Sequence, residues 1–164
     1  MGNISQDTPF GCKSHRHCVA QALADAEQIC RLRNSRLTPL RKRVLELIWS
    51  SHKPLGAYTL LEQLAQEGHK PAPPTVYRAL DFLQAQGLVH KVNALNAYLG
   101  CSHPQSVDHN RQLLICRLCG NVAELHMSEA IQAIEVVAQS ASFHVEQQAL
   151  EILGVCQQCS QQRA

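Results

Sequence analysis

Apolar residues recur at helical spacing in four stretches of the first half of the chain. The first runs from Val19 to Cys30, and Cys30 lies on its apolar stripe, where a buried small side chain is expected. A second helix begins at Thr38 and Pro39, an N-cap followed by proline at the first helical position. A third covers residues 57–66, and a fourth covers residues 75–83 before the stop at Gly87. The pattern therefore predicts four helices before residue 88.

Two short β-prone runs follow, residues 88–92 and 97–99, around a turn that contains asparagine. Three helices and a hairpin are the plan of a winged helix-turn-helix, whose last helix enters the major groove of DNA. The polar residues near the start of that helix, Thr75, Tyr77 and Arg78, would then face DNA, and an arginine there can reach guanine. Further basic residues on flanking elements are expected to hold phosphates: Arg36, Arg41, Lys42 and Arg43.

The second half predicts a small sheet with one helix. Residues 112–116 and 121–126 are plausible strands around Gly120, and residues 143–153 are a third. Between them, Ser128 caps a helix. Its apolar residues are Ile131, Ile134, Val137 and Ala138. The expected fold class is α+β, with a flexible tail (1–17), a winged-helix domain (18–99), a hinge (100–105) and a small α/β domain (106–164) with little core of its own.

Charge divides the chain in the same way. Residues 1–93 carry 12 Lys/Arg against 7 Asp/Glu, or +5, whereas residues 94–164 carry 3 against 6, or −3. Only the basic half is suited to a polyanion such as DNA. The first 18 residues are polar and no run is apolar enough to cross a bilayer, so a soluble cytoplasmic protein with reduced thiols is expected. No nucleophile, base and orienting group form a set, so an enzyme is not expected.

Two Cys-x-x-Cys pairs, Cys116/Cys119 and Cys156/Cys159, are the strongest chemical signal. Four thiolates at these spacings build a tetrahedral site that suits a structural Zn²⁺. Such a site would attach the exit of the last strand to the end of the first, and its binding free energy would also stabilise the fold. An iron–sulfur cluster, a thiol redox pair or simply reduced cysteines remain alternatives.

A second group of possible ligands lies near the expected domain junction. It contains two imidazoles, one thiolate and one carboxylate: His90, Cys101, His109 and Glu124. This mixture suits Zn²⁺ better than metals that prefer oxygen ligands. His103 competes with His109 for the same role. A third group, Cys12, His15, His17 and Cys18, lies in the expected tail and is interpreted as a chance cluster.

The residues now support a resemblance to the ferric uptake regulator family, over about residues 20 to 160. It rests on the run from Pro74 to Leu83, on Gly87, on residues 89–92 and on the run from Ile115 to Gly120. Iron-sensing members carry a His-His-Asp-His run where this chain has Val107, Asp108, His109 and Asn110, so the chain looks most like the zinc-sensing branch.

That resemblance implies roles for particular residues. His90, Cys101, His109 and Glu124 match the regulatory zinc ligands, and the four paired cysteines match the structural zinc, giving two zinc ions per chain. Tyr77 and Arg78 match DNA contacts of the recognition helix, Tyr58 matches a DNA-contacting tyrosine, and Arg36 matches a residue near the minor groove. The family acts as a homodimer through its C-terminal domain. The expected function is a zinc-responsive repressor of zinc-uptake genes; the alternatives are a sensor of another divalent metal, of iron or of peroxide, and a thiol redox protein.

Overall fold

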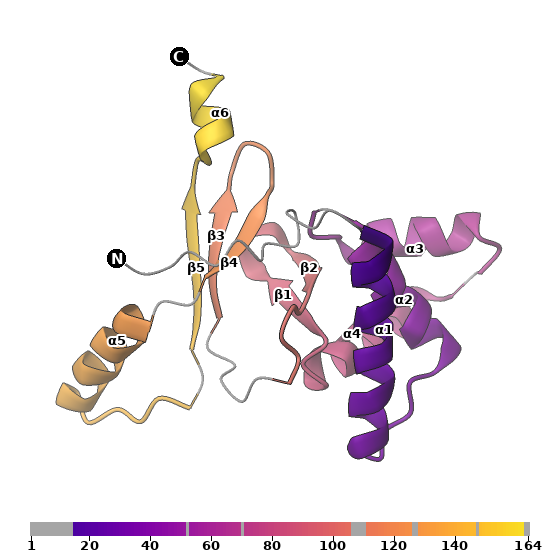
Figure 1. Cartoon of the computed structure of the whole chain (residues 1–164), viewed down its shortest axis with the longest axis horizontal. Coiled ribbons are helices and arrows are strands. Elements are labelled where there is room, and N and C mark those ends of the chain that lie inside the picture. The colour runs from indigo at the N-terminus through magenta and orange to yellow at the C-terminus, as the bar shows by residue number, and fades with distance from the viewer. Residues whose placement is uncertain are drawn as a thin grey trace. The chain divides into compact units, whose positions relative to one another are not determined.

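The computed structural model describes residues 15–51, 53–69, 71–105, 111–125, 128–146 and 148–162 (Figure 1). They form two compact units, an N-terminal unit that ends at Gln105 and a C-terminal unit that follows it. Helices and small sheets occur together, which confirms the predicted α+β class.

Helices dominate the N-terminal unit and a two-stranded hairpin completes it (Figure 1). The elements are α1 (His15–Leu32), α2 (Pro39–Ser50), α3 (Ala57–Gln66), α4 (Pro73–Ala85), β1 (Val89–Val92), the 3-10 turn η1 (Asn93–Leu95) and β2 (Ala97–Gly100). Helices α2 to α4 followed by the hairpin are the predicted winged helix-turn-helix. Helix α1 begins at His15, inside the stretch expected to be a tail, because its first turn is polar and apolar periodicity could not reveal it.

The caps and apolar stripes that predict these helices are present in the structure. Thr38 is the N-cap of α2, and its Oγ1 accepts a hydrogen bond from the backbone N of Arg41 at 3.4 Å. On α4, the predicted inner residues are all buried, and Cys30 of α1 is buried in the same core. These inner residues are Val76, Ala79, Leu80 and Leu83. Burial of one stripe on each helix leaves the opposite face of α4 exposed.

The hairpin is attached to the helices at both ends. Gly87 has a φ of +71° and ends α4, and Asn96 has a φ of 45° in the turn between the strands. Leu55, just before α3, exchanges two backbone hydrogen bonds with Tyr98 of β2, at 2.8 and 2.9 Å. The Cα of Gly100 lies beneath the indole of Trp49 on α2, so that a Cβ at residue 100 would approach the ring to 2.5 Å. The hairpin therefore fits the end of α2 only without a side chain at residue 100.

The C-terminal unit is a three-stranded sheet with two helices (Figure 1). Its elements are β3 (Arg111–Cys116), β4 (Val122–Leu125), α5 (Ser128–Ser140), β5 (Ala149–Gly154) and α6 (Gln157–Gln161). The order is β4-β3-β5, with β4 antiparallel and β5 parallel to β3. The strand predicted for residues 143–153 begins only at Ala149, because a parallel partner must first return along the sheet after α5. Ser128, predicted as a cap, is the first helical residue.

Burial in the C-terminal unit is confined to few apolar side chains. Leu113, Ile115 and Val122 are buried on one face of the sheet, whereas α5 buries none of its residues. This agrees with the expected small core and leaves the unit dependent on other interactions. Within the ranges described above, no helix is long and apolar enough to span a bilayer.

Candidate metal centre and DNA-binding surface

The four paired cysteines come together at one end of the C-terminal sheet. Cys116 is the last residue of β3, Cys119 lies in the following turn, and Cys156 and Cys159 lie at the start of and within α6. Their Sγ atoms all lie within 4.8 Å of one another. Two backbone hydrogen bonds shape the site: Gly120 N donates to Cys116 O at 2.9 Å, and Arg117 N donates to Gly154 O at 3.0 Å. The second bond joins the ends of β3 and β5, as the sequence predicts.

The spacing of the sulfur atoms fits a tetrahedral zinc site. A Zn–S bond of about 2.3 Å places the sulfurs of a tetrahedron about 3.8 Å apart. The Sγ atoms of Cys119 and Cys156 are 3.8 Å apart. Four thiols without oxygen ligands favour Zn²⁺ over Mg²⁺ or Ca²⁺. The cluster therefore has both the ligand type and the dimensions of a structural zinc site.

Local hydrogen bonds already favour one thiolate in this cluster. Backbone N–H groups of Cys119 and Cys156 lower the pKa of Cys116 to about 6. The backbone N of Cys156 lies 3.4 Å from the Sγ of Cys116. Cys159 behaves in the opposite way, because its hydrogen bond with Cys156, burial and the neighbouring thiols raise its pKa to about 12. A divalent cation would relieve the repulsion between four thiolates, so metal binding is expected to release protons here.

Two of the four predicted regulatory ligands lie on the hairpin. The register pairs His90 with Leu99, and Cys101 N donates to Leu88 O at 3.0 Å. Diagonal neighbours in an antiparallel pair share a face, so the His90 and Cys101 side chains lie on the same face of the hairpin. Both are buried, with 2% and 8% exposure. The wing therefore carries a buried imidazole and a buried thiol on one face, and both groups can bind a metal.

The other two predicted regulatory ligands belong to the C-terminal unit or lie outside the described residues. Glu124 is half-buried on β4 and pairs with Leu113 of β3. His109 lies outside the described residues, and its competitor His103 is exposed. The four-ligand regulatory set therefore stays a prediction. Of the N-terminal group, Cys12 also lies outside the described residues, whereas His17 is exposed on α1.

The predicted DNA-contacting residues are all exposed on the N-terminal unit. They are Arg36, Tyr58, Thr75, Tyr77 and Arg78. Tyr58 near the start of α3 is 72% exposed, which is high for a large aromatic side chain. On α4, Tyr77 and Arg78 lie on the face opposite the buried stripe. An exposed aromatic and an exposed arginine near a helix start are suited to contact base edges and phosphates.

Two of the basic residues predicted near this surface are paired with carboxylates. Lys42 forms an ion pair with Glu27, and Arg43 forms ion pairs with Glu46 and Glu67. The bonds to Glu67 and Glu46 raise the pKa of Arg43, and Lys42 lowers the pKa of Glu27. Among the described residues, Arg36 and Arg41 form no ion pair with a carboxylate, and the phosphate-holding role of this basic group stays a prediction. Periodicity could not show the ion pairs, because the carboxylates lie on α1, on α2 and just after α3.

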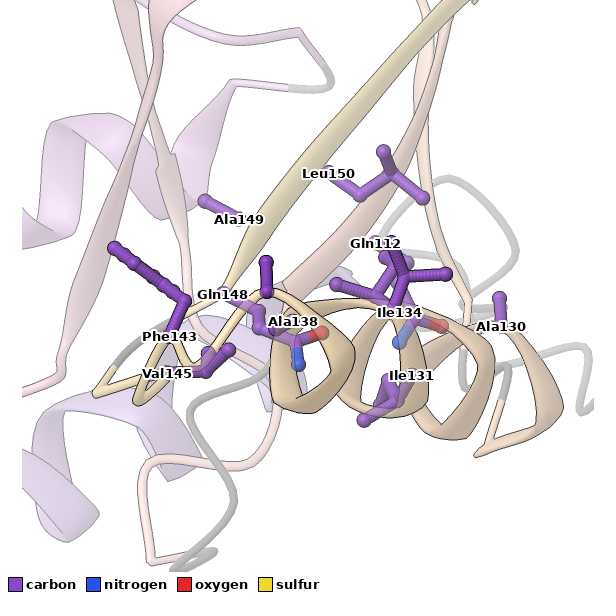
Figure 2. A pocket seen from close by; sticks show the side chains of 12 residues that line it. Gln112, Ala130, Ile131, Ile134, Ala138, Phe143, Val145, Gln148, Ala149 and Leu150 are labelled. Atoms are coloured by element: carbon purple, nitrogen blue, oxygen red, sulfur yellow. The ribbon is translucent and has the colours of Figure 1, made fainter.

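An apolar groove in the C-terminal unit was not expected. Its volume is about 560 Å³, and it lies between α5 and the start of β5 (Figure 2). Ile131, Ile134, Val137 and Ala138, the stripe of α5 expected to face a core, line this groove instead. Val137 remains 68% exposed, and Phe143, which also lines the groove, remains 66% exposed. Exposure of so many apolar groups is typical of a surface that binds another protein.

Comparison with known proteins identifies relatives over most of the chain. The model of the ferric uptake regulator family matches residues 33–153. The zinc uptake regulation protein of Escherichia coli (strain K12) is 40% identical over 140 residues, which cover 85% of this chain and 81% of that protein. A solved structure of a zinc uptake regulator complexed with zinc and DNA has a TM-score of 0.83 at 37% identity, covering 88% of this chain and 97% of that one.

A second solved structure, of holo XcZur, has a TM-score of 0.78 at 40% identity and covers 86% of this chain and 98% of that chain. Both the sequence and the fold are thus shared across the winged-helix unit and the cysteine-bearing unit. These matches confirm the resemblance drawn from the helix, hairpin and Cys-x-x-Cys motifs. The chain belongs to the ferric uptake regulator family.

Proposed function

We propose that this protein is a zinc-responsive, DNA-binding transcriptional repressor of zinc-uptake genes, acting in the reducing cytoplasm. The observation that carries the proposal is the position of His90 and Cys101, buried on one face of the hairpin that belongs to the DNA-binding unit itself. Ligands in that place connect metal binding directly to the wing. The relatives named as zinc uptake regulators support zinc as the metal.

Two zinc ions per chain have different tasks in this proposal. Cys116, Cys119, Cys156 and Cys159 hold a structural ion, and their positions attach β5 and α6 to the end of β3. His90 and Cys101 hold the regulatory ion together with His109 and Glu124. When bound there, Zn²⁺ would be coordinated by ligands from separate segments and would hold those segments together. The hairpin then has fewer accessible orientations, so less ordering is required when it binds DNA.

DNA recognition is assigned to the exposed face of α4. Arg78 reads a base edge in the major groove, Tyr77 and Thr75 contact the adjoining bases or backbone, and Tyr58 and Arg36 hold the flanking backbone. Two such units in a homodimer would present their helices to half-sites about 34 Å apart. Only the N-terminal unit carries the excess of positive charge that this binding requires.

The function is tested by measuring operator affinity at controlled free zinc. Affinity is expected to rise by about 5- to 150-fold when zinc fills the regulatory site, the usual range of coupling between two binding sites. A mild chelator that leaves one zinc per chain provides the low-zinc arm. Equal binding in both arms, with the structural zinc retained, would contradict the proposal, and a zinc content of one per chain at saturation would remove the regulatory site.

The homodimer is proposed to form through the groove between α5 and β5, with a second copy of the chain as its occupant. Substitution of Val137 by glutamate is expected to shift the protein from dimer to monomer, because a carboxylate would be buried without a partner. Light scattering coupled to size-exclusion chromatography measures the mass. Gln139→Glu adds the same charge to the same helix outside the groove and should leave the dimer intact. A dimer that persists in Val137→Glu would exclude this groove as the interface.

A further inference from the structure

The side chain of Arg41 joins two parts of the DNA-binding surface. It starts from the first turn of α2, and its Nη1 donates a hydrogen bond to the backbone carbonyl of Arg36 at 2.6 Å. Its guanidinium carbon also lies 3.6 Å from the centre of the Phe82 ring on α4. One planar group therefore contacts the loop that carries Arg36 and the helix that carries Arg78.

The spacing along α4 gives the contact with Phe82 its significance. Phe82 follows Arg78 by four residues, so the two side chains lie one above the other on the same side of the helix. Phe82 is half-buried against the core, which fixes the ring under the guanidinium. A shift of Arg41 would thus change the position of Arg36 relative to Arg78.

The contacts of Arg41 differ from those of its neighbours Lys42 and Arg43. Those two side chains are neutralised by carboxylates, whereas the described contacts of Arg41 are a carbonyl and an aromatic face. The Phe82 ring covers one face of the guanidinium, and one N–H donates to the Arg36 carbonyl. A planar, delocalised cation can make both contacts together, and a lysine ammonium cannot reproduce the stack and the directed bond.

We propose that Arg41 is a positioning residue for operator recognition, which sets the Arg36 loop at a fixed place relative to α4. Arg41 acts through these two neighbours and not as a phosphate contact of its own. The inference rests on the proposed function, since it concerns the preference for an operator over other DNA. It assigns a role to the contact between Arg41 and Phe82.

The test measures the ratio of affinities for operator and random DNA at saturating zinc. Arg41→Gln and Phe82→Leu are each expected to lower this ratio by about three- to tenfold, the size of one cation–π contact. The double variant should be no worse than either single variant, because both remove the same contact. Phe82→Tyr keeps the aromatic face and should retain the ratio, whereas Arg41→Lys should not restore it.

The salt dependence of binding separates positioning from direct contact. Loss of a phosphate contact would reduce the slope of log affinity against log salt by about 1. Arg41→Gln should leave that slope unchanged. Arg78→Ala is measured for comparison, because Arg78 is the residue proposed to read a base. Three results would each overturn the proposal. The first is a reduced salt slope in Arg41→Gln, and the second is a double variant whose loss of the affinity ratio is the product of the two single losses. The third is an affinity ratio in Arg41→Lys equal to that of the wild type.

Two further measurements keep the outcome decisive. Thermal unfolding shows whether each variant is folded. If Arg41→Gln does not fold, Phe82→Leu and Phe82→Tyr are compared instead. The proposal is supported if Phe82→Leu loses the preference for operator over random DNA and Phe82→Tyr keeps it, and it is overturned if the two variants have equal preference. If the wild-type protein shows no zinc-dependent preference for the operator, the proposed function is wrong. If the wild type shows this preference and Arg41→Gln keeps it, only the Arg41 proposal is wrong.

Discussion

Substitution of Cys156 by serine is expected to unfold the C-terminal unit while the winged-helix unit remains folded. Among the described residues the unit buries few apolar side chains, and α5 buries none, so its stability is expected to depend on the cysteine cluster and the zinc ion proposed for it. Structural zinc sites contribute about 10 to 16 kcal/mol, as much as the whole stability of an ordinary domain. Serine has a similar volume but supplies no thiolate to the site.

Zinc content and thermal unfolding monitored by circular dichroism would measure this change together. One zinc per chain should be lost, and the transition of the C-terminal unit should disappear while that of the N-terminal unit persists. Cys30→Ala is the control, because Cys30 is a buried apolar residue of the N-terminal core. It should lower only the N-terminal transition and retain all zinc. A Cys156→Ser protein with full zinc content and an unchanged C-terminal transition would refute the structural role.

Substitution of Cys101 by serine is expected to abolish the zinc response of operator binding and to leave the C-terminal unit folded. Cys101 lies on the wing beside His90, and its loss removes the only thiolate from the proposed regulatory set. Affinity at saturating zinc should fall about 5- to 150-fold, to the level of the low-zinc protein. Fluorescence anisotropy of a labelled operator, measured at buffered zinc concentrations, reports both limits.

A neighbouring substitution distinguishes loss of a ligand from disturbance of the predicted hinge. Ser102→Ala alters the next residue, which is half-buried, and should keep the full zinc response. The zinc content of Cys101→Ser should be one per chain, that of the cysteine cluster alone. If Cys101→Ser still binds operator more tightly with zinc than without, Cys101 is not a regulatory ligand.

Local sequence signals account for most of the N-terminal unit. A threonine before a proline predicts the start of α2, and the stripe from Val76 to Leu83 predicts the buried face of α4, because both signals depend on residues within a few positions of each other. Thr38 caps α2 as predicted, and the Asn96 turn forms with a positive φ. The cysteine pairs are likewise predictable, since four thiols at these spacings have few other uses in a reducing compartment.

Features that depend on distant residues could not be predicted in the same way. The apolar stripe of α5 would have the same spacing whether the helix packed on its own core or lined an open groove. Only the structure shows that Val137 is exposed. The ion pairs of Lys42 and Arg43 depend on carboxylates of other helices. The strand expected from residue 143 begins at Ala149, because β-prone residues do not specify where a parallel strand pairs. The regulatory set stays a prediction because His109 lies outside the described residues.

The fit between Trp49 and Gly100 has an evolutionary consequence. The two residues share one volume, which the indole fills because residue 100 contributes no side chain. A larger residue at 100 is compatible with this fold only if residue 49 becomes smaller at the same time. Single substitutions at either position are therefore disfavoured intermediates, and α2 and β2 should change together among descendants of this chain. Since residue 100 precedes Cys101, the strand that leads to this predicted zinc ligand is tied in its evolution to a helix distant in sequence.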